Sequence, residues 1–464
     1  MINKLLLRNK KLCEDLVNEL LDEYEYVSLL GVASNGIRIR VDNKNITLSD
    51  SDTEYGYVIK IYNDGSISEY SFNNISEKEI PYIIVNVKNT VESNKDYKKV
   101  SLNSIIDQPL VKDFNRDDEG LLEEKQIVQE LSSLKDEALA YDERIINAIA
   151  MFNKIDVSKI FISRNKNLSQ HYTWTNAYLM AVAKEGNVIK VGRSVTGDYN
   201  SKIAIDMLKD KINSTCDISI KLLKATQIEP GEYDVITDPS ITGLIAHEAF
   251  GHGVEMDMFV KNRAKGKDYI GEYVASPLIS MHDGACSCNS VGSYFFDDDG
   301  VLAHDTLIIN EGKLVTGISD MLSALELGTI PTGNGRRESY LRKAYSRMTN
   351  TFFSKGTSKV EDMIKSIKHG YYLCETNNGM EDPKNWQIQC TAEYGLEIVD
   401  GKFSGKIVSP VVISGYVPDV LKSISMVSDG FEVSGSGYCG KGHKEWVRVS
   451  DGGPHLKAKV KLGW

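Results

Sequence analysis

The chain has 464 residues, of which 41% are apolar and 26% are charged, a composition typical of a globular protein with two or three domains. The net charge of −11 argues against a nucleic-acid binder that relies on a broad basic surface. The sequence contains no apolar run of 18 residues and no apolar stretch of the signal-peptide type at its start. We therefore expect a cytoplasmic protein, with neither nucleic acid nor a membrane as its partner.

The N-terminal part is predicted to mix helices with strands. Leucines at helical spacing predict a helix over 3–25. Alternating β-branched residues predict strands at 26–41, 55–72 and 80–87, and the NDG of 63–65 indicates a hairpin turn. Further along, we expect helices over 117–153 and 198–226 and strands around 159–164 and 179–194.

Beyond residue 226 the pattern becomes β-rich. A strand is predicted at 233–237, and Pro239 followed by Ser240 predicts a helix that begins near 240. From 285 onward glycine-rich short strands dominate, interrupted by one helix that ends at Gly370. We expect an α+β protein. An N-terminal α/β domain (1–225) precedes a β-rich, antiparallel, barrel-like domain (226–464) that carries the helix from 240.

That helix contains LIAHEAFGHGVEMD, in which His247 and His252 are five residues apart. On a regular α-helix two such positions lie about 140° apart, on nearly opposite faces. One extra residue, inserted as a π-bulge, restores a common face. Gly251 and Gly253 relax the backbone restrictions beside His252. A metal site here therefore predicts a helix that bulges at 249–252.

Glu248 directly follows the first histidine. A glutamate in this position can take a proton from a water activated by a metal and pass one to the leaving amine of a peptide. The pattern is loose, however, and the chain has eight histidines. Spacing alone leaves open both a metal site and a chance pair on an ordinary helix.

A catalytic zinc has three protein ligands and an open position. The candidates for the third ligand are Glu255, Asp257, His282, Asp283, Cys286, Cys288, Cys439 and His443. Spacing does not choose among them. The CxC of 286–288 has no matching pair, so we interpret it as two plain thiols. Cys439 close to His443 also leaves a cysteine peptidase open.

Two further motifs carry charge. PTGNGRRESY (331–340) lacks the pattern of a phosphate-binding loop, so we interpret it as a structural loop. Its Arg336 and Arg337 are candidate substrate-binding residues. FDDDG (296–300) lacks the spaced ligands of a calcium loop and is predicted to be a solvated turn.

AHEAFGHGVEMD resembles the AHEAxGHGxExD motif of the TldD/PmbA family, once called modulators of DNA gyrase. FDDDG, PTGNGRRESY, RMTNT (347–351), ISMV (424–427) and CGKG (439–442) follow in the family's order. Residues 54–72 are similar, more loosely, to the family's opening domain. The resemblance covers nearly the whole chain and is strongest across 240–450.

TldD-like members carry the HExxxH motif and a C-terminal cysteine, whereas PmbA-like (TldE) members lack this set. The present chain resembles the TldD kind. The resemblance implies a zinc metallopeptidase with one Zn²⁺ per chain, held by His247, His252 and Cys439, and with Glu248 as general base. It also implies that the substrates are short or unfolded peptides. The expected assembly is a homodimer or a heterodimer with a TldE/PmbA-like paralogue.

An alternative function is a metal-containing binding or regulatory module, acting on gyrase or a toxin–antitoxin system without peptidase turnover. Its metal would be structural, with four ligands and no open position. The sequence also departs from the family pattern at 377–395, where it is longer and more polar. This departure indicates a separate subgroup of the family and leaves substrate selection open.

Overall fold

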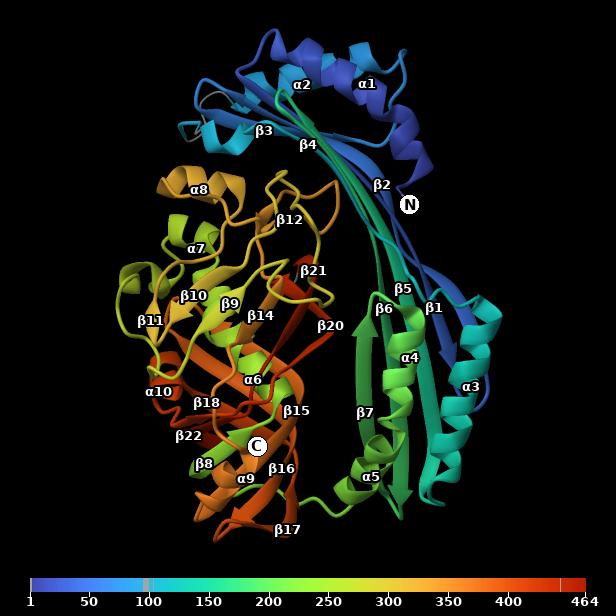
Figure 1. The fold of residues 1–464 in the computed structure, drawn as a ribbon, viewed down its shortest axis with the longest axis vertical. Helices are drawn as coiled ribbons and strands as arrows, with labels where there is room; N and C mark the ends of the chain where they lie inside the picture. Colours follow the sequence, from blue (N-terminus) through green and yellow to red (C-terminus); the bar gives the residue numbers. More distant parts are fainter. Residues whose placement is uncertain (1, 95–99, 103, 443) are drawn as a thin grey trace.

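The computed structural model describes residues 2–94, 100–102, 104–442 and 444–464. A long sheet with helices on it forms the N-terminal part, and a compact body of two larger sheets and a two-stranded pair forms the C-terminal part (Figure 1). The chain is thus a mixed α+β protein, as predicted. None of the helices among these residues is both long enough and apolar enough to cross a membrane.

The N-terminal sheet has the strand order β3-β2-β1-β5-β6-β4, and β7 also pairs with β6. Its neighbours are antiparallel except for β4, which runs parallel to β6. The strands are β1 (Tyr26–Val41), β2 (Ile46–Asn63), β3 (Ser66–Phe72), β4 (Leu110–Arg116), β5 (Ile145–Ser163), β6 (Lys166–Glu185) and β7 (Val188–Asp198). The predicted turn joins β2 to β3, with positive φ angles at Asp64 and Gly65.

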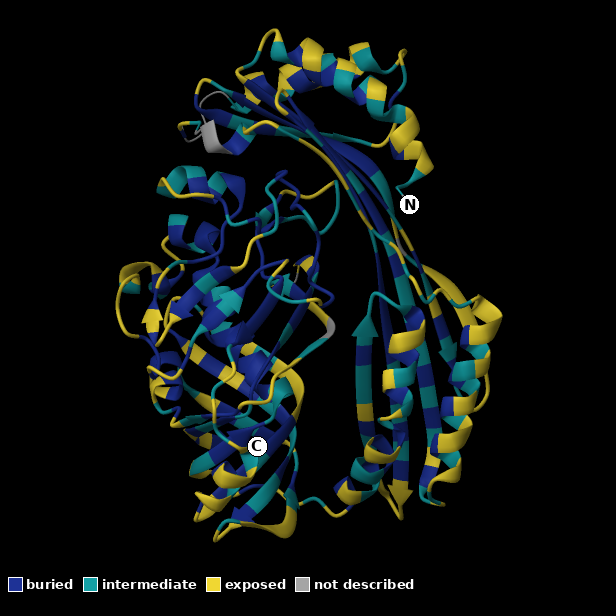
Figure 2. Cartoon of the chain, viewed as in Figure 1, coloured by how far each residue is buried: buried dark blue, intermediate teal, exposed yellow. Residues whose placement is uncertain are grey.

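Two groups of helices cover this sheet and bury separate apolar cores against it. The first is α1 (Lys4–Leu21) with α2 (Ile80–Asn94), and the second is α3 (Glu124–Ala140), α4 (Ser201–Lys209) and α5 (Ile212–Leu222). Each helix turns buried residues to the sheet and exposed residues outward (Figure 2). This is the pattern of amphipathic surface helices.

Three N-terminal predictions need correction. The strand predicted at 80–87 is the start of α2, because Ile83, Val87 and Val91, four apart, all lie buried on one helix face. The helix predicted over 117–153 covers only α3, since β5 begins at Ile145. The helix predicted over 198–226 is two helices, α4 and α5.

A five-stranded barrel forms one half of the C-terminal body. Its strands follow the order β15-β8-β22-β18-β16, and β16 pairs back with β15. They are β8 (Gly231–Thr237), β15 (His369–Asp382), β16 (Gln387–Val399), β18 (Val411–Tyr416) and β22 (Leu456–Gly463), while β17 (Lys402–Val408) and β19 (Met426–Val427) pair at its edges. The barrel-like C-terminal part is thereby confirmed.

The other half is a sheet of order β11-β10-β9-β14-β21-β20. Its strands are β9 (Met281–Asp283), β10 (Thr306–Asn310), β11 (Lys313–Leu314), β14 (Asn350–Phe353), β20 (Glu432–Lys441) and β21 (Lys444–Gly453); β12 (Gly335–Arg336) and β13 (Tyr345–Ser346) form a separate pair. Helix α6 (Pro239–Ala246) contacts both this sheet and the barrel. This central position explains why every residue of α6 from Ile241 onward is buried.

Four short helices complete the body: α7 (Met256–Val260), α8 (Met321–Leu327), α9 (Val360–Lys365) and α10 (Val417–Lys422). The helix predicted to end at Gly370 ends earlier, at Lys365, and Gly370 lies in β15. A Cβ atom at Gly370 would lie 1.9 Å from the carbonyl oxygen of Asp234 on β8. This glycine therefore permits two strands to approach closely and does not cap a helix.

Buried ion pairs join the C-terminal body to the N-terminal sheet. Lys60 of β2 pairs with Asp299, and Lys159 of β5 pairs with Asp298. The aspartates of FDDDG are thus buried, and the predicted solvated turn is wrong. The lysines that neutralise them lie more than a hundred residues away in the sequence, so local composition did not reveal this burial.

Candidate metal centre

Helix α6 begins at the end of strand β8. The Asp238 side chain accepts a hydrogen bond of 2.8 Å from the Ile241 backbone N–H, and Pro239 is the first helical residue. The N-cap is therefore Asp238 rather than Ser240, although the predicted start near 240 is confirmed. Proline suits this position because its missing N–H would have no partner in the helix.

A π-helical turn from His247 to Gly251 directly follows α6. The predicted bulge is confirmed and begins two residues earlier than expected. The bulge brings the two imidazole rings together, with centroids 5.1 Å apart. Gly251 has an ordinary φ of −68°, so it does not relax the backbone. Its role is close packing, because a Cβ there would lie 2.1 Å from the Met348 sulfur.

Strand β20 brings Cys439 to both histidines. Its Sγ lies 3.2 Å from His247 Nε2 and 3.3 Å from His252 Nε2. The three side chains form a group whose candidate ligand atoms all lie within 4.8 Å of one another. Cys439 and His247 are buried, and His252 is partly buried.

The geometry of these donors fits a zinc ion. Bonds of about 2.0 Å to nitrogen and about 2.3 Å to sulfur at tetrahedral angles place the donors roughly 3.5 Å apart. The remaining ring nitrogens face carboxylates, with His252 Nδ1 3.2 Å from Glu255 and His247 Nδ1 3.8 Å from Asp451. Such carboxylates are the usual partners of metal-binding histidines.

Electrostatics also favour a thiolate at Cys439. Burial raises the pKa of this thiol, but His252 and His247 outweigh burial and hold the pKa well below its usual value. Burial lowers the pKa of His247, yet the adjacent Cys439 brings it up to about 9. The thiolate is the form of cysteine that binds metals.

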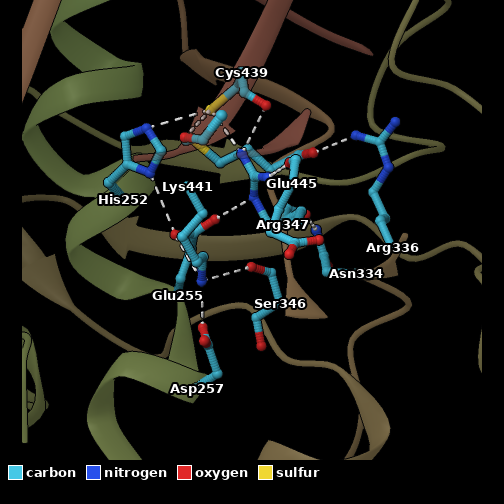
Figure 3. A network of polar contacts seen from close by, with 12 residues as sticks. His252, Glu255, Asp257, Asn334, Arg336, Ser346, Arg347, Cys439, Lys441 and Glu445 are labelled. Atoms are coloured by element: carbon cyan, nitrogen blue, oxygen red, sulfur yellow. Dashed lines mark hydrogen bonds and ion pairs between the residues drawn. The ribbon is translucent and has the colours of Figure 1, made fainter. Parts of the chain in front are cut away.

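Arg347, which the sequence did not single out, completes the surroundings of the thiolate. This fully buried side chain donates hydrogen bonds to Glu255 Oε1 (3.0 Å), to the Cys439 carbonyl oxygen (3.0 Å) and to Cys439 Sγ (2.9 Å). Figure 3 shows its guanidinium between Glu255 and Cys439. Arg347 is the first residue of the RMTNT motif. Its position in a family motif was therefore the only feature of the sequence that could have indicated a role.

The other ligand candidates that the structure describes lie outside this group. Glu255 orients His252, and Asp257 binds Lys441 at 2.6 Å. His282 pairs with Asp305, whereas Asp283 accepts hydrogen bonds from Asn334, Thr349 and Thr351. Cys286 and Cys288 are free thiols, as predicted. His443 lies outside the described residues.

Glu248 lines a cavity of about 670 Å³ together with His247, His252 and Cys439. The segment 377–383 of the β15–β16 hairpin forms another wall of the same cavity. At Gly379 a Cβ atom would lie only 2.6 Å from Glu248 Cγ. This hairpin segment therefore passes directly over the predicted general base.

The two arginines of PTGNGRRESY are not among the residues that line this cavity. Arg337 makes hydrogen bonds of 2.7 and 2.9 Å to the Glu69 carboxylate of the N-terminal sheet. Arg336 donates to the Met348 carbonyl oxygen. Both arginines line a cleft of about 540 Å³ that shares Tyr438 and Trp446 with the lining of the metal cavity. Arg337 thus joins the two parts of the chain, and substrate binding by either arginine stays a prediction.

The family model described as the PmbA/TldA metallopeptidase C-terminal domain matches residues 230–461. The chain belongs to the TldD/PmbA metallopeptidase family. A metalloprotease of Methanocaldococcus jannaschii is 29% identical over 432 residues, which cover 90% of this chain and 94% of the relative. A zinc metalloprotease TldD homolog of Saccharolobus solfataricus is 25% identical over 93% of this chain and 94% of its own.

Solved structures of family members share the fold. TldE from Thermococcus kodakarensis has a TM-score of 0.75 at 18% identity and covers 97% of this chain and 99% of its own. A protein from Bacteroides thetaiotaomicron that was proposed as a modulator of DNA gyrase has a TM-score of 0.77 at 17% identity, with both chains fully covered. The present TldD/PmbA protein is thus a metalloprotease with a His–His–Cys candidate metal site.

Proposed function

We propose that this chain is a zinc-dependent peptidase that hydrolyses short or unfolded peptides with Glu248 as general base. The convergence of the His247, His252 and Cys439 donor atoms beside Glu248 in one cavity is the observation that carries this proposal. The name of the S. solfataricus relative supports the choice of zinc. A cavity of about 670 Å³ admits a few residues of an extended peptide and excludes a folded domain.

The proposed mechanism assigns a task to each group around the cavity. His247, His252 and Cys439 would hold the zinc ion, which supplies Lewis-acid polarisation of the scissile carbonyl and acidifies water. Glu248 accepts the proton of the attacking water at its carboxylate and passes it to the leaving amine nitrogen. Glu255 accepts from the His252 Nδ1–H group and keeps its Nε2 directed at the site. The Asp451 carboxylate lies 3.8 Å from His247 Nδ1, too far for a hydrogen bond.

The proposed assembly is a dimer, either of two copies of this chain or with a TldE/PmbA-like paralogue. The shared fold with TldE is compatible with such a pairing. Light scattering on the purified chain, with and without a co-expressed paralogue, measures the mass directly. A chain that stays monomeric in both preparations contradicts the proposal.

The decisive experiment combines metal analysis with cleavage of an unfolded peptide. Glu248→Gln is expected to keep its zinc and lose turnover, because it retains the ligands and lacks only the proton acceptor. Cys439→Ala is expected to lose zinc, whereas Cys216→Ala, which removes a buried thiol of α5, should retain it.

The alternative, a regulatory module with a structural metal, predicts other results. It requires a wild-type protein that binds zinc and cleaves no peptide even with a TldE-like partner present. Full activity of Glu248→Gln would remove that residue from the mechanism. A fully zinc-loaded Cys439→Ala variant would remove Cys439 from the ligand set.

A further inference from the structure

Glu381, near the end of strand β15, lines the metal cavity and has no assigned task there. Both of its carboxylate oxygens are buried and have no hydrogen-bond partner within the described parts of the chain. The residue as a whole is partly exposed. Buried carboxylates in proteins are normally paired or hydrogen-bonded, because removing the charge from water is costly. An unpartnered carboxylate in a cavity therefore points to a partner that arrives from outside.

The course of strand β15 places Glu381 next to α6 and the π-helical turn that carries the histidines. Strand β15 contacts α6 and the π-helical turn that follows it (Figure 1). Gly379 and Glu381 are two residues apart on β15, so they face the same side of the strand. Gly379 packs on Glu248, and a Cβ at Gly253 would lie 2.9 Å from Glu381 Oε1. The Glu381 carboxylate thus rests against the residue that follows His252.

Within the described residues, no charged group around the cavity pairs directly with Glu381. Among the described residues, four carboxylates line the cavity, those of Glu248, Glu255, Glu381 and Asp451, against one lysine, Lys441, and the two candidate metal ligands His247 and His252. Lys441 already pairs with Glu255 at 3.2 Å and with Asp257 at 2.6 Å. Glu381 is also separate from the group of three that can hold a metal. A cationic group of the substrate is therefore a candidate partner for Glu381, separate from the proposed zinc.

We propose that Glu381 determines specificity by binding a positively charged amine of the peptide substrate beside the metal centre. The proposal rests on the peptidase function proposed above and names the chemistry of one subsite. A primary ammonium offers three donors to a carboxylate and makes strong charge-assisted hydrogen bonds. In a peptide this group is either the α-amine of the N-terminus or the side chain of a lysine.

Four matched peptides distinguish the two sources of the amine. The first has a free N-terminus and no lysine, the second is its N-acetylated form, the third is acetylated with one lysine, and the fourth replaces that lysine by norleucine. Wild-type kcat/KM is expected to fall about ten- to a hundredfold on losing the recognised amine, the range for a hydrogen bond between charged groups. A fall on acetylation identifies the α-amine, and a fall on lysine replacement identifies the side chain.

Glu381→Gln is expected to cleave the charged and uncharged members of each pair at equal rates. Glu393→Gln, on the neighbouring strand β16 and not among the residues that line the cavity, should discriminate as the wild type does. Because Glu381 makes no ion pair with any residue that the structure describes, the variant should unfold at an unchanged or higher temperature. A Glu381→Gln variant that keeps the wild-type preference overturns the proposal. An active wild type that cleaves all four peptides at equal rates overturns it as well.

A peptide-binding assay distinguishes a failure of this subsite proposal from a failure of the proposed peptidase function. Labelled members of the four peptides are titrated against Glu248→Gln and against Glu248→Gln/Glu381→Gln, with fluorescence anisotropy as the readout. Binding that weakens about ten- to a hundredfold for the charged peptides alone, on adding Glu381→Gln, supports the subsite even if the wild type shows no turnover. Equal affinities of the two proteins for every peptide overturn the subsite, whether or not the wild type is a peptidase.

Discussion

Replacing Arg347 by methionine tests whether the buried surroundings of the thiolate matter as much as the ligands. The substitution removes the guanidinium from Glu255 Oε1 and from both the carbonyl oxygen and the sulfur of Cys439. Lys441 still pairs with Glu255, but two backbone carbonyls, those of Cys439 and Glu445, lose their charged donor. Methionine fills much of the volume without replacing these bonds.

The magnitude follows from the burial of the group. Arg347 is 0% exposed and Glu255 is 1% exposed, and removing one partner of a buried ion pair costs about 3–5 kcal/mol. Loss of a contact that orients a metal ligand typically lowers metal affinity about 10- to 100-fold. Arg347→Lys keeps the charge and loses the forked geometry, so it should fall between wild type and Arg347→Met in both properties.

Two assays measure these effects. Urea denaturation of the metal-free protein reports the free energy of unfolding, and competition with a chromophoric chelator reports zinc affinity. Arg38→Met, which removes an exposed arginine of the N-terminal sheet, is the matched control and should leave zinc affinity unchanged. If Arg347→Met binds zinc as tightly as the wild type, the guanidinium does not position Cys439 and the reasoning is wrong.

Three further predictions test other parts of the structure. Gly379→Ala places a Cβ 2.6 Å from Glu248 Cγ and should lower kcat while zinc content stays constant; Gly430→Ala, where the space is open, is the control. Burial raises the pKa of Glu69, but Arg337 and Lys60 bring it below its usual 4.5. The ion pairs of Glu69 with Arg337 and Lys60 therefore stabilise the fold above pH 4.5, and this stabilisation is lost as the pH falls below that value. Glu69→Gln should be about 3–5 kcal/mol less stable than the wild type at pH 7. It should also lose less stability than the wild type as the pH falls, so parallel acid-unfolding curves of the two proteins would contradict this prediction. Asp238→Ala removes the cap of α6 and should lower the free energy of unfolding by about 0.5–2 kcal/mol in urea denaturation.

Local patterns in the sequence predicted the elements whose cause is local. The NDG turn depends on residues that tolerate a positive φ angle, and Asp64 and Gly65 both have a positive φ in the structure. The five-residue spacing of His247 and His252 required a bulge, because a regular helix separates such positions, and the π-helical turn is present. The short apolar run at 80–87 was ambiguous, since strands and buried helix faces both contain such runs.

Tertiary contacts decided the rest of the site. The choice of Cys439 among eight candidate third ligands came from family resemblance, and the structure explains it by the approach of β20 to the π-helical turn. The sequence did not predict the role of Arg347, because a buried arginine is identified only by the hydrogen-bond acceptors that surround it in the fold. The aspartates of FDDDG appeared to be solvated for the same reason, since the lysines that neutralise them come from the other part of the chain.

The sequence by itself thus determined the mixed fold, the metal helix with its bulge and the family. The tertiary structure alone decided which distant side chains surround the two histidines. It also placed the unpartnered Glu381 beside them. The physical reason is that helix and turn geometry depend on neighbours within a few residues, whereas the charge and solvation of a buried group depend on every chain segment packed against it.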